Sequence, residues 1–305
     1  MNKELIINAS FEGVEIALLE DKKLVELHFG RGQDQFAVGD LYLGKVKKLI
    51  PGLNAAFVDV GFEKDAFLHY TDLSPYARSL LKFTQAAITD NSTGGFDFAG
   101  FQVEPEIIKT GKINEVLGGK PNILVQILKE PIAAKGPRLS CELSLPGRFV
   151  VITPFNDIVA VSRKIHSADE RKRLHRIIEA IKPKNFGVIV RTAAEGVSEE
   201  ELTSDIARLK AQWEEIYQKS QNPNFHPPVA LYTEPDLAVR VIRDIFSEDF
   251  GILKVQGDDA HHQISEYLGF IAPELSSKIE KYTGTGDLFA DYRVDEQLAK
   301  AFDRK

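Results

Sequence analysis

The sequence predicts an α+β protein of several domains, in which one α/β domain is built from two separated stretches of the chain. The first observation is a set of strands at the amino terminus that has no partner nearby. The second is a run of short strands and turns, and the third is a later part with helical periodicity. At 305 residues, 43% hydrophobic and 27% charged, the chain is long enough for two or three compact units.

The amino-terminal residues predict a small antiparallel meander. Apolar and polar residues alternate through residues 5–20 around a turn at Glu12 and Gly13, which predicts two strands, and residues 24–29 predict a third. Three strands within about 30 residues are too few to form a domain. We therefore expect them to pair with a segment from elsewhere in the chain.

Short strands separated by turns predict a small β-barrel such as an OB-fold from residue 38 onward. The expected strands are residues 41–50, 55–60, 65–70 and 122–129. Residues 84–119 are weakly patterned and are punctuated by Thr93-Gly94-Gly95 and Gly118-Gly119. We interpret this stretch as a long loop or insertion in the barrel.

Two phenylalanines fall on the polar faces of barrel strands. Because side chains alternate along a strand, Phe57 lies beside Asp59, and Phe67 lies beside His69. Exposed aromatic rings near basic side chains such as Lys45 can stack the bases of single-stranded nucleic acid. Packing of the same rings in the core is the alternative.

The next part predicts a compact block of strands and helices. Residues 148–152, 158–162 and 186–190 have strand patterns, and the last of these ends at Arg191 and Thr192. Capping boxes at residues 167–170 and 198–201 each begin an amphipathic helix. We expect the order strand, strand, helix, strand, helix.

A proline-rich linker at residues 222–228 separates this block from a final α/β segment. That segment has strand patterns at 230–232 and 251–255 and helix patterns at 236–245 and 259–268. It can supply the partner that the opening meander lacks. The result would be one discontinuous domain with the barrel and the block inserted into it.

Charge gives two opposed indications about partners. The net charge of −7 argues against nucleic acid, but residues 161–191 contain nine Lys or Arg and three acidic residues, a local excess of +6. A solvated helix face is the alternative for this run.

The single cysteine, Cys141, cannot form an internal disulfide, and we interpret it as structural. Without a long apolar run or a secretory leader, we expect a soluble cytoplasmic protein without a membrane partner.

Four stretches in order along nearly the whole chain resemble the ribonuclease E/G family. They are residues 39–46 (GDLYLGKV), 53–61 (LNAAFVDVG), 188–193 (VIVRTA) and 276–284 (SSKIEKYTG). The resemblance implies a ribonuclease-H-like domain at 1–37 and 229–283 and an S1 (OB-fold) domain at 38–134, with its insertion near 84–119. It also implies a 5′-sensor domain at 135–228 and the start of a DNase-I-like domain at 284–305.

The resemblance also implies the residues that bind RNA. Phe57 and Phe67 would hold single-stranded RNA with Lys135 as a basic contact beside them, and Lys45 lies on a neighbouring strand. A 5′-monophosphate would be bound by Arg191 and Thr192, with Arg163 nearby and the backbone at Gly147 and Val151 closing the pocket.

Arginine suits this role because its planar group of donors matches a phosphate, and threonine adds a hydroxyl donor. Such charge-assisted hydrogen bonds contribute about 1.5–3 kcal/mol each. An ion pair of Arg191 with Glu195 or Glu199 is the structural alternative.

Catalysis in this family implies a DNase-I-like domain in which two aspartates hold magnesium, followed by a Cys-x-x-Cys zinc link between subunits. We expect neither site in this chain. The acids Asp287, Asp291 and Asp295 are assigned to helix starts rather than to a metal.

The expected function is RNA binding and 5′-monophosphate sensing within a single-strand-specific endoribonuclease of RNA decay and rRNA maturation, a homo-oligomer at full length. The alternative is a stand-alone, non-catalytic S1-type RNA-binding protein. An OB-fold module for other ligands is disfavoured by the basic run and the outward aromatics.

Overall fold

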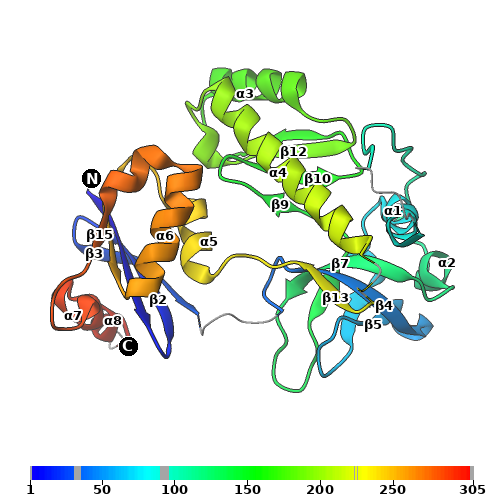
Figure 1. The fold of residues 1–305 in the computed structure, drawn as a ribbon, viewed down its shortest axis with the longest axis horizontal. Helices are drawn as coiled ribbons and strands as arrows, with labels where there is room; N and C mark the ends of the chain where they lie inside the picture. The colour runs from blue at the N-terminus through cyan, green and yellow to red at the C-terminus, as the bar shows by residue number, and fades with distance from the viewer. Residues whose placement is uncertain (1, 31–35, 90–95, 223, 225, 303–305) are drawn as a thin grey trace. The chain divides into compact units, whose positions relative to one another are not determined.

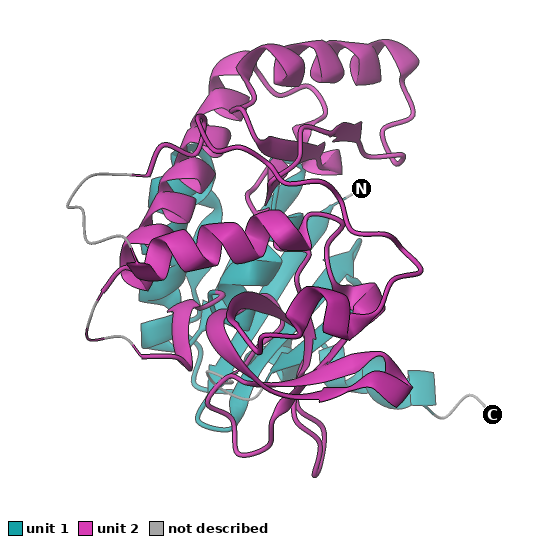
Figure 2. Ribbon diagram, turned by 90° about the vertical axis from the view of Figure 1, so that its right-hand side faces the viewer, with its two compact units in different colours: residues 1–34, 235–305 teal, residues 35–234 magenta. Residues whose placement is uncertain are grey.

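The computed structural model describes residues 2–30, 36–89, 96–222, 224 and 226–302. The chain divides into two compact units (Figures 1 and 2). The first unit combines residues 1–34 with residues 235–305, and the second unit comprises residues 35–234. Both ends of the chain therefore belong to the same unit, and the second unit is inserted between them.

The first unit contains a five-stranded mixed sheet with the order β15-β14-β1-β2-β3. Its strands are β1 (Lys3–Ser10), β2 (Gly13–Glu20), β3 (Lys23–Gly30), β14 (Phe250–Gln256) and β15 (Ile279–Lys281). The opening meander is confirmed, with β1 antiparallel to β2 and parallel to β14. The partner that the meander lacked is thus a strand more than 200 residues later in the chain.

Helices cover both faces of this sheet. On one face, Leu5 and Ile7 of β1 pack with residues of α5 (Leu237–Ile245) and α6 (Asp258–Ile271), which η4 (Pro273–Lys278) follows. On the other face, Ile6 packs with residues of α7 (Leu288–Asp291) and α8 (Val294–Phe302). Because consecutive side chains of a strand point to opposite faces, the apolar run in β1 is buried on both sides.

Acidic residues begin the helices of this unit, as the sequence predicts. Asp236 and Asp287 accept hydrogen bonds from the amides of Val239 and Phe289, so both act as N-caps. Asp291 ends α7 and accepts a hydrogen bond from the Tyr282 hydroxyl, and Asp295 lies in the first turn of α8.

The second unit contains a closed five-stranded barrel, which is consistent with an OB-fold. Its strands are β4 (Leu41–Ile50), β5 (Ala55–Asp59), β6 (Ala66–His69), β7 (Asn122–Lys129) and β8 (Arg138–Ser140), with η1 (Pro51–Leu53) and η2 (Tyr70–Asp72) between them. Pairing runs β4-β5-β6-β8-β7, and β7 also pairs with β4, which closes the barrel. The four predicted barrel strands are confirmed, while β8, only three residues long, was not predicted.

Strand β13 (Val229–Tyr232) corrects one sequence-based expectation. We expected it to join the opening meander, but it pairs antiparallel with β4 of the barrel. Residues 45–50 of β4 pair with β5, which leaves residues 41–43 open on that edge for β13. The unpaired backbone of this long strand therefore attracts β13 into the second unit.

The stretch from 84 to 119 is more than a loop. It begins inside α1 (Ala77–Thr89) and includes α2 (Ile113–Leu117), while its Thr93-Gly94-Gly95 turn lies outside the described residues. The Asn185 amide donates hydrogen bonds to the carbonyls of Phe98 and Phe101, at 2.8 and 2.9 Å. The insertion thus packs against the strands and helices that follow the barrel.

Those later elements form a four-stranded sheet with the order β11-β12-β10-β9, and Figure 1 shows α3 and α4 beside it. The elements are β9 (Leu145–Pro146), β10 (Val150–Pro154), β11 (Val159–Val161), α3 (Ala168–Ile181), β12 (Phe186–Val190), η3 (Thr192–Ala194) and α4 (Glu199–Ser220). The predicted linker follows α4, and within it residues 223 and 225 lie outside the described residues.

The two predicted capping boxes differ in outcome. At α4, Ser198 and Glu201 exchange both hydrogen bonds, so this box is confirmed. At α3, Ser167 accepts from the Glu170 amide, but the Glu170 carboxylate turns to Arg173 and to the amide of Gly196. The second half of that box is therefore wrong, because a guanidinium offers this carboxylate a stronger, charged partner.

Cys141 lies in the core of the second unit and is 2% exposed. Burial raises the pKa of its thiol, which keeps it neutral and confirms the structural interpretation. In the described part of the chain, no helix is long and apolar enough to cross a membrane.

Candidate RNA-binding sites

Phe57 and Phe67 form an aromatic face on the outside of the barrel. They lie directly opposite each other on β5 and β6, and their ring centroids are 6.0 Å apart. Both rings are partly exposed, whereas Val58 and Leu68, their neighbours in sequence, are fully buried. The predicted faces of both strands are confirmed.

A hollow of about 600 Å³ adjoins this aromatic face. It is lined by Phe57, Lys64, Asp65, Phe67, Ala134, Lys135, Gly136 and Arg138. The structure thus brings the predicted contact Lys135 together with both rings. Arg138 is fixed at the edge by two hydrogen bonds to Asp72, at 2.9 and 3.0 Å.

Gly136 allows the Lys135 loop to approach the barrel closely. A Cβ atom at residue 136 would lie 2.4 Å from the carbonyl oxygen of Asp65 and 2.7 Å from that of Lys64. Only glycine tolerates such contact with backbone atoms. The glycine therefore sets the distance between Lys135 and the rings.

Lys45 lies elsewhere on the barrel surface and does not line the hollow. It is exposed on β4 and lies opposite Asp59 of β5. Asp59 is two residues after Phe57 and therefore lies on the same face of β5. Partial burial opposes ionisation of Asp59, but hydrogen bonds from Lys47 and the Gly61 amide outweigh it and lower the pKa of Asp59. Lys45 thus adds a cation next to an ionised carboxylate.

Arg191 and Thr192 lie where β12 ends and η3 begins, and we call them the Arg191–Thr192 site. The Arg191 guanidinium donates to the carbonyl of Gly147 at 2.7 Å, and the Arg191 amide donates to the carbonyl of Phe149. The Thr192 hydroxyl lies 3.0 Å from the Ser162 hydroxyl. Both side chains are therefore held by the neighbouring turn and strand.

The other predicted pocket residues gather around this pair. Gly147 is the acceptor just described, and Val151 lies opposite Ile189 on β12. Arg163 is exposed and directly follows Ser162, the partner of Thr192. The structure brings all five residues to one end of this sheet.

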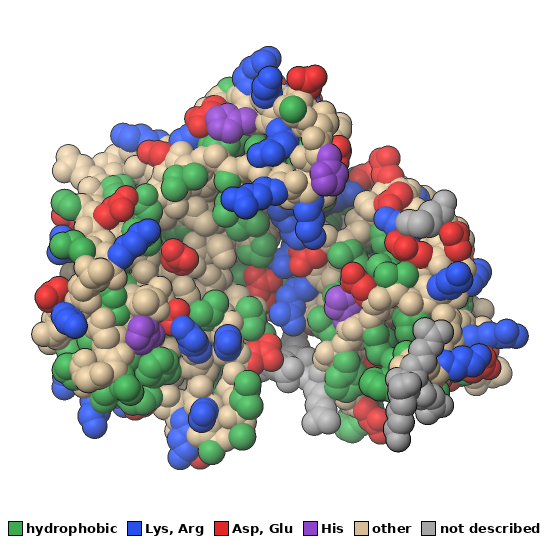
Figure 3. Space-filling model, turned by 180° about the vertical axis from the view of Figure 1, so that it is seen from behind, with side chains coloured by type: hydrophobic (Ala, Val, Ile, Leu, Met, Phe, Trp, Pro, Cys, Tyr) green, Lys and Arg blue, Asp and Glu red, His purple; other side chains and the backbone are tan. Residues whose placement is uncertain are grey.

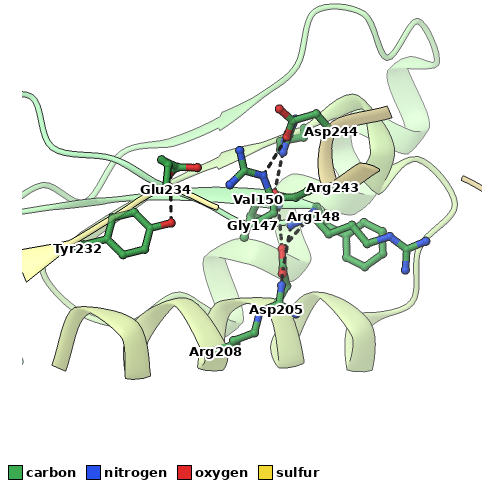
Figure 4. Close-up of polar contacts among 11 residues, drawn as sticks. Gly147, Arg148, Val150, Asp205, Arg208, Tyr232, Glu234, Arg243 and Asp244 are labelled. Carbon is green, nitrogen blue, oxygen red and sulfur yellow. Dashed lines mark hydrogen bonds and ion pairs between the residues drawn. The ribbon is translucent and has the colours of Figure 1, made fainter. Parts of the chain in front are cut away.

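Asp205 of α4 holds the turn that carries Gly147. Its carboxylate is 3% exposed and accepts hydrogen bonds from the amides of Arg148, Phe149 and Val150, at 3.3, 2.8 and 3.1 Å (Figure 4). Arg208 pairs with the same carboxylate. A Cβ atom at Gly147 would lie 2.4 Å from this carboxylate, so the turn and helix meet closely there.

Sequence reasoning missed Asp205, although a signal was present. The residue falls between Leu202 and Ile206 on the buried side of α4, where an unpaired acid would be costly. A lone acidic residue among core positions indicates a satisfied buried carboxylate. Ser162 was missed as well, and the sequence around it carries no comparable signal.

Comparison with known proteins identifies the family of this chain. Residues 144–305 match the sequence model of the Ribonuclease E/G family. Ribonuclease G of Escherichia coli strain K12 is 32% identical over 305 residues, which is all of this chain and 58% of that protein. The chain belongs to the ribonuclease E/G family.

Other family members match at similar levels. Ribonuclease G of Haemophilus influenzae is 33% identical over 303 residues, 99% of this chain and 57% of that protein. Ribonuclease E of Nostoc sp. strain PCC 7120 is 36% identical over 269 residues, 88% of this chain and 34% of that protein. The chain thus spans just over half the length of these ribonucleases G.

Proposed function

We propose that this chain is the RNA-binding and 5′-monophosphate-sensing part of a single-strand-specific endoribonuclease. The observation that carries the proposal is the Arg191–Thr192 site, in which a guanidinium fixed on the Gly147 carbonyl lies beside a hydroxyl. A fixed guanidinium loses little freedom on binding a phosphate, and arginine and threonine together offer charged and neutral donors.

The aromatic face supports the same function. Two partly exposed rings 6.0 Å apart, with Lys135 at the same hollow, form a surface on which bases can stack. Stacking does not depend on the chemistry of the RNA end. The two sites would therefore make separate contributions to affinity.

Magnesium and the zinc link remain part of the proposal for the longer enzyme, together with homo-oligomer formation and a cytoplasmic location. Among the described residues, no group of three or more His, Cys, Asp or Glu could hold a metal ion. We derive no catalytic step through either metal.

The test is binding of two short single-stranded RNAs that differ only in a 5′-monophosphate or a 5′-hydroxyl, at fixed salt with magnesium. We expect the phosphorylated RNA to bind at least about tenfold more tightly, since one charge-assisted hydrogen bond contributes about 1.5–3 kcal/mol. Arg191→Ala and Thr192→Val should each reduce this ratio. Phe57→Ala should weaken the binding of both RNAs equally, by about fivefold or more, since stacking contributes about 1–3 kcal/mol per base.

Phe270→Ala removes an aromatic ring that is 75% exposed in the first unit, and it is the matched control for Phe57. An unchanged ratio in Arg191→Ala would contradict 5′-end sensing. A Phe57 variant that binds like the Phe270 control would contradict base stacking at this position. Equal binding of the two RNAs by the parent chain would favour a stand-alone S1-type RNA-binding protein, and cleavage would reveal an active site within it.

A further inference from the structure

A second basic surface lies between helix α3 and strand β11 in the second unit, and we call it the α3–β11 groove. Its volume is about 800 Å³, and its lining residues are Val159, Ala160, Val161, Arg163, Ala168, Arg171, Lys172, His175, Arg176 and Glu179. The six α3 residues recur at spacings of three and one, so they share one face of the helix. An adjacent side of α3 buries Leu174 and Ile178 in the core.

The groove is strongly cationic. Four of its residues are Lys or Arg, and Glu179 is its only carboxylate. Over the described residues, none of Arg163, Arg171, Lys172 and Arg176 has a carboxylate within ion-pair distance. In Figure 3, Lys and Arg side chains gather over the α3 end of this unit, at the top of the view.

Glu170, the acid directly before Arg171, is already committed to other partners. The carboxylate of Glu170, in the first turn of α3, forms two 2.7 Å hydrogen bonds with Arg173 and binds the Gly196 amide. This leaves the groove cations facing solvent. Four cations held together with a single carboxylate, Glu179, repel each other, so the groove favours a polyanionic ligand.

The groove begins next to the Arg191–Thr192 site. Arg163 lines the groove, and Ser162, the residue before it, contacts the Thr192 hydroxyl at 3.0 Å. From Ala168 to Glu179 the helix face extends for about 16 Å, at the rise of an α-helix. A chain whose end lies at Thr192 can therefore continue along α3.

We propose that the α3–β11 groove binds the backbone phosphates of the nucleotides that follow the 5′ end of a single-stranded RNA. This inference rests on the proposed function and adds a separate binding surface to it. Continuity with the Arg191–Thr192 site favours RNA over an acidic polypeptide. The groove makes the affinity for RNA depend on RNA length and on salt. The Arg191–Thr192 site distinguishes a 5′-monophosphate from a 5′-hydroxyl.

The test uses the full chain with the double variant Lys172→Gln/Arg176→Gln, which leaves every residue of the Arg191–Thr192 site intact. The control, Lys109→Gln/Lys210→Gln, removes the same charge from exposed positions of the same unit outside the groove. Dissociation constants are measured for a 5′-monophosphorylated dinucleotide and a single-stranded decamer, each also with a 5′-hydroxyl, at several salt concentrations.

We expect the groove variant to bind the decamer about tenfold more weakly than the control does, with a salt slope lower by about 1.4 for two lost phosphate contacts. Dinucleotide affinity and the ratio between phosphorylated and hydroxyl ends should stay unchanged. A groove variant that matches the control on the decamer would overturn the proposal. The proposal would also be overturned if the variant changed only the ratio between the affinities for phosphorylated and hydroxyl RNA. The groove would then be part of the Arg191–Thr192 site.

Failure of the proposed function has a different signature. If the parent chain does not prefer a 5′-phosphate but the groove variant still loses decamer affinity and salt slope, the groove binds RNA and end sensing is wrong. Polyglutamate serves as a competitor of similar charge. If its binding depends on Lys172 and Arg176 while decamer binding does not, the partner is an acidic polypeptide and the inference fails.

Discussion

Asp205 shows how one buried carboxylate can organise a binding site that it does not itself enter. It accepts three backbone hydrogen bonds from residues 148–150 and pairs with Arg208. The turn that it holds carries the Gly147 carbonyl, which in turn fixes the guanidinium of Arg191. The orientation of Arg191 therefore depends on a side chain of a different element, α4.

We expect Asp205→Ala to lower the free energy of unfolding of the second unit by about 2–4 kcal/mol, since it leaves buried amides and a paired arginine without their acceptor. Urea unfolding followed by fluorescence of the single tryptophan, Trp213, measures this, because Trp213 lies in the core of the same unit. Glu214→Ala, at an exposed position of the same helix, is the control. If Asp205→Ala lowers the free energy of unfolding no more than Glu214→Ala does, the turn that carries Gly147 is stable without Asp205.

Glu170 predicts a specific pH dependence of stability. Hydrogen bonds from Arg173, reinforced by the Gly196 amide, lower the pKa of Glu170 from 4.5 to about 2. A carboxylate whose pKa is lowered in the folded state stabilises the fold above its unfolded pKa and loses that contribution as the pH falls from about 4.5 to about 2.

Glu170→Gln should therefore destabilise the chain at pH 7 by up to about 1 kcal/mol, a value typical of a partly exposed pair. The difference from the parent should shrink below about pH 4.5, as measured by urea unfolding over a pH series. Glu179→Gln, an exposed glutamate on the same helix, should show little difference at any pH. A constant difference for Glu170→Gln across the series would exclude the ionic contribution.

Helix α1 shows how an insertion can become part of a core. Phe83 is fully buried, stacks on Trp213 with ring centroids 5.2 Å apart, and contacts Phe155 edge to face. Phe96 and Phe98 of the insertion pack edge to face around the same ring. The insertion therefore joins the barrel to the elements that carry the Arg191–Thr192 site within one unit.

Phe83→Ala should lower the free energy of unfolding of this unit by about 3–5 kcal/mol, since it leaves a large cavity in an aromatic cluster. Trp213 fluorescence should report the change directly because the two rings stack. Ile88→Ala, at a position of the same helix that is 37% exposed, should cost less than about 1 kcal/mol. Similar losses in both variants would mean that the cluster is not a stability centre.

The chain as a whole is acidic, but it has a local basic stretch. The net charge of −7 coexists with an excess of +6 in residues 161–191, of which α3 itself contributes only +1 because its four Lys or Arg stand against three acidic residues. In the first unit β1 pairs with β14, although the whole second unit separates these strands along the sequence. Each unit has its own hydrophobic core, which in the first unit lies on both faces of the sheet.

Sequence patterns predicted most strands and helices and the outward faces of Phe57 and Phe67, because alternation and helical periodicity are local properties that burial imposes on neighbouring residues. The family followed from short motifs in order. The partner of β13, the packing of residues 96–101, the roles of Asp205 and Ser162, and the α3–β11 groove emerged only in the folded chain. Each depends on contacts between residues far apart in sequence, where hydrogen-bond partners and unpaired charges are fixed by tertiary packing and leave no periodic trace.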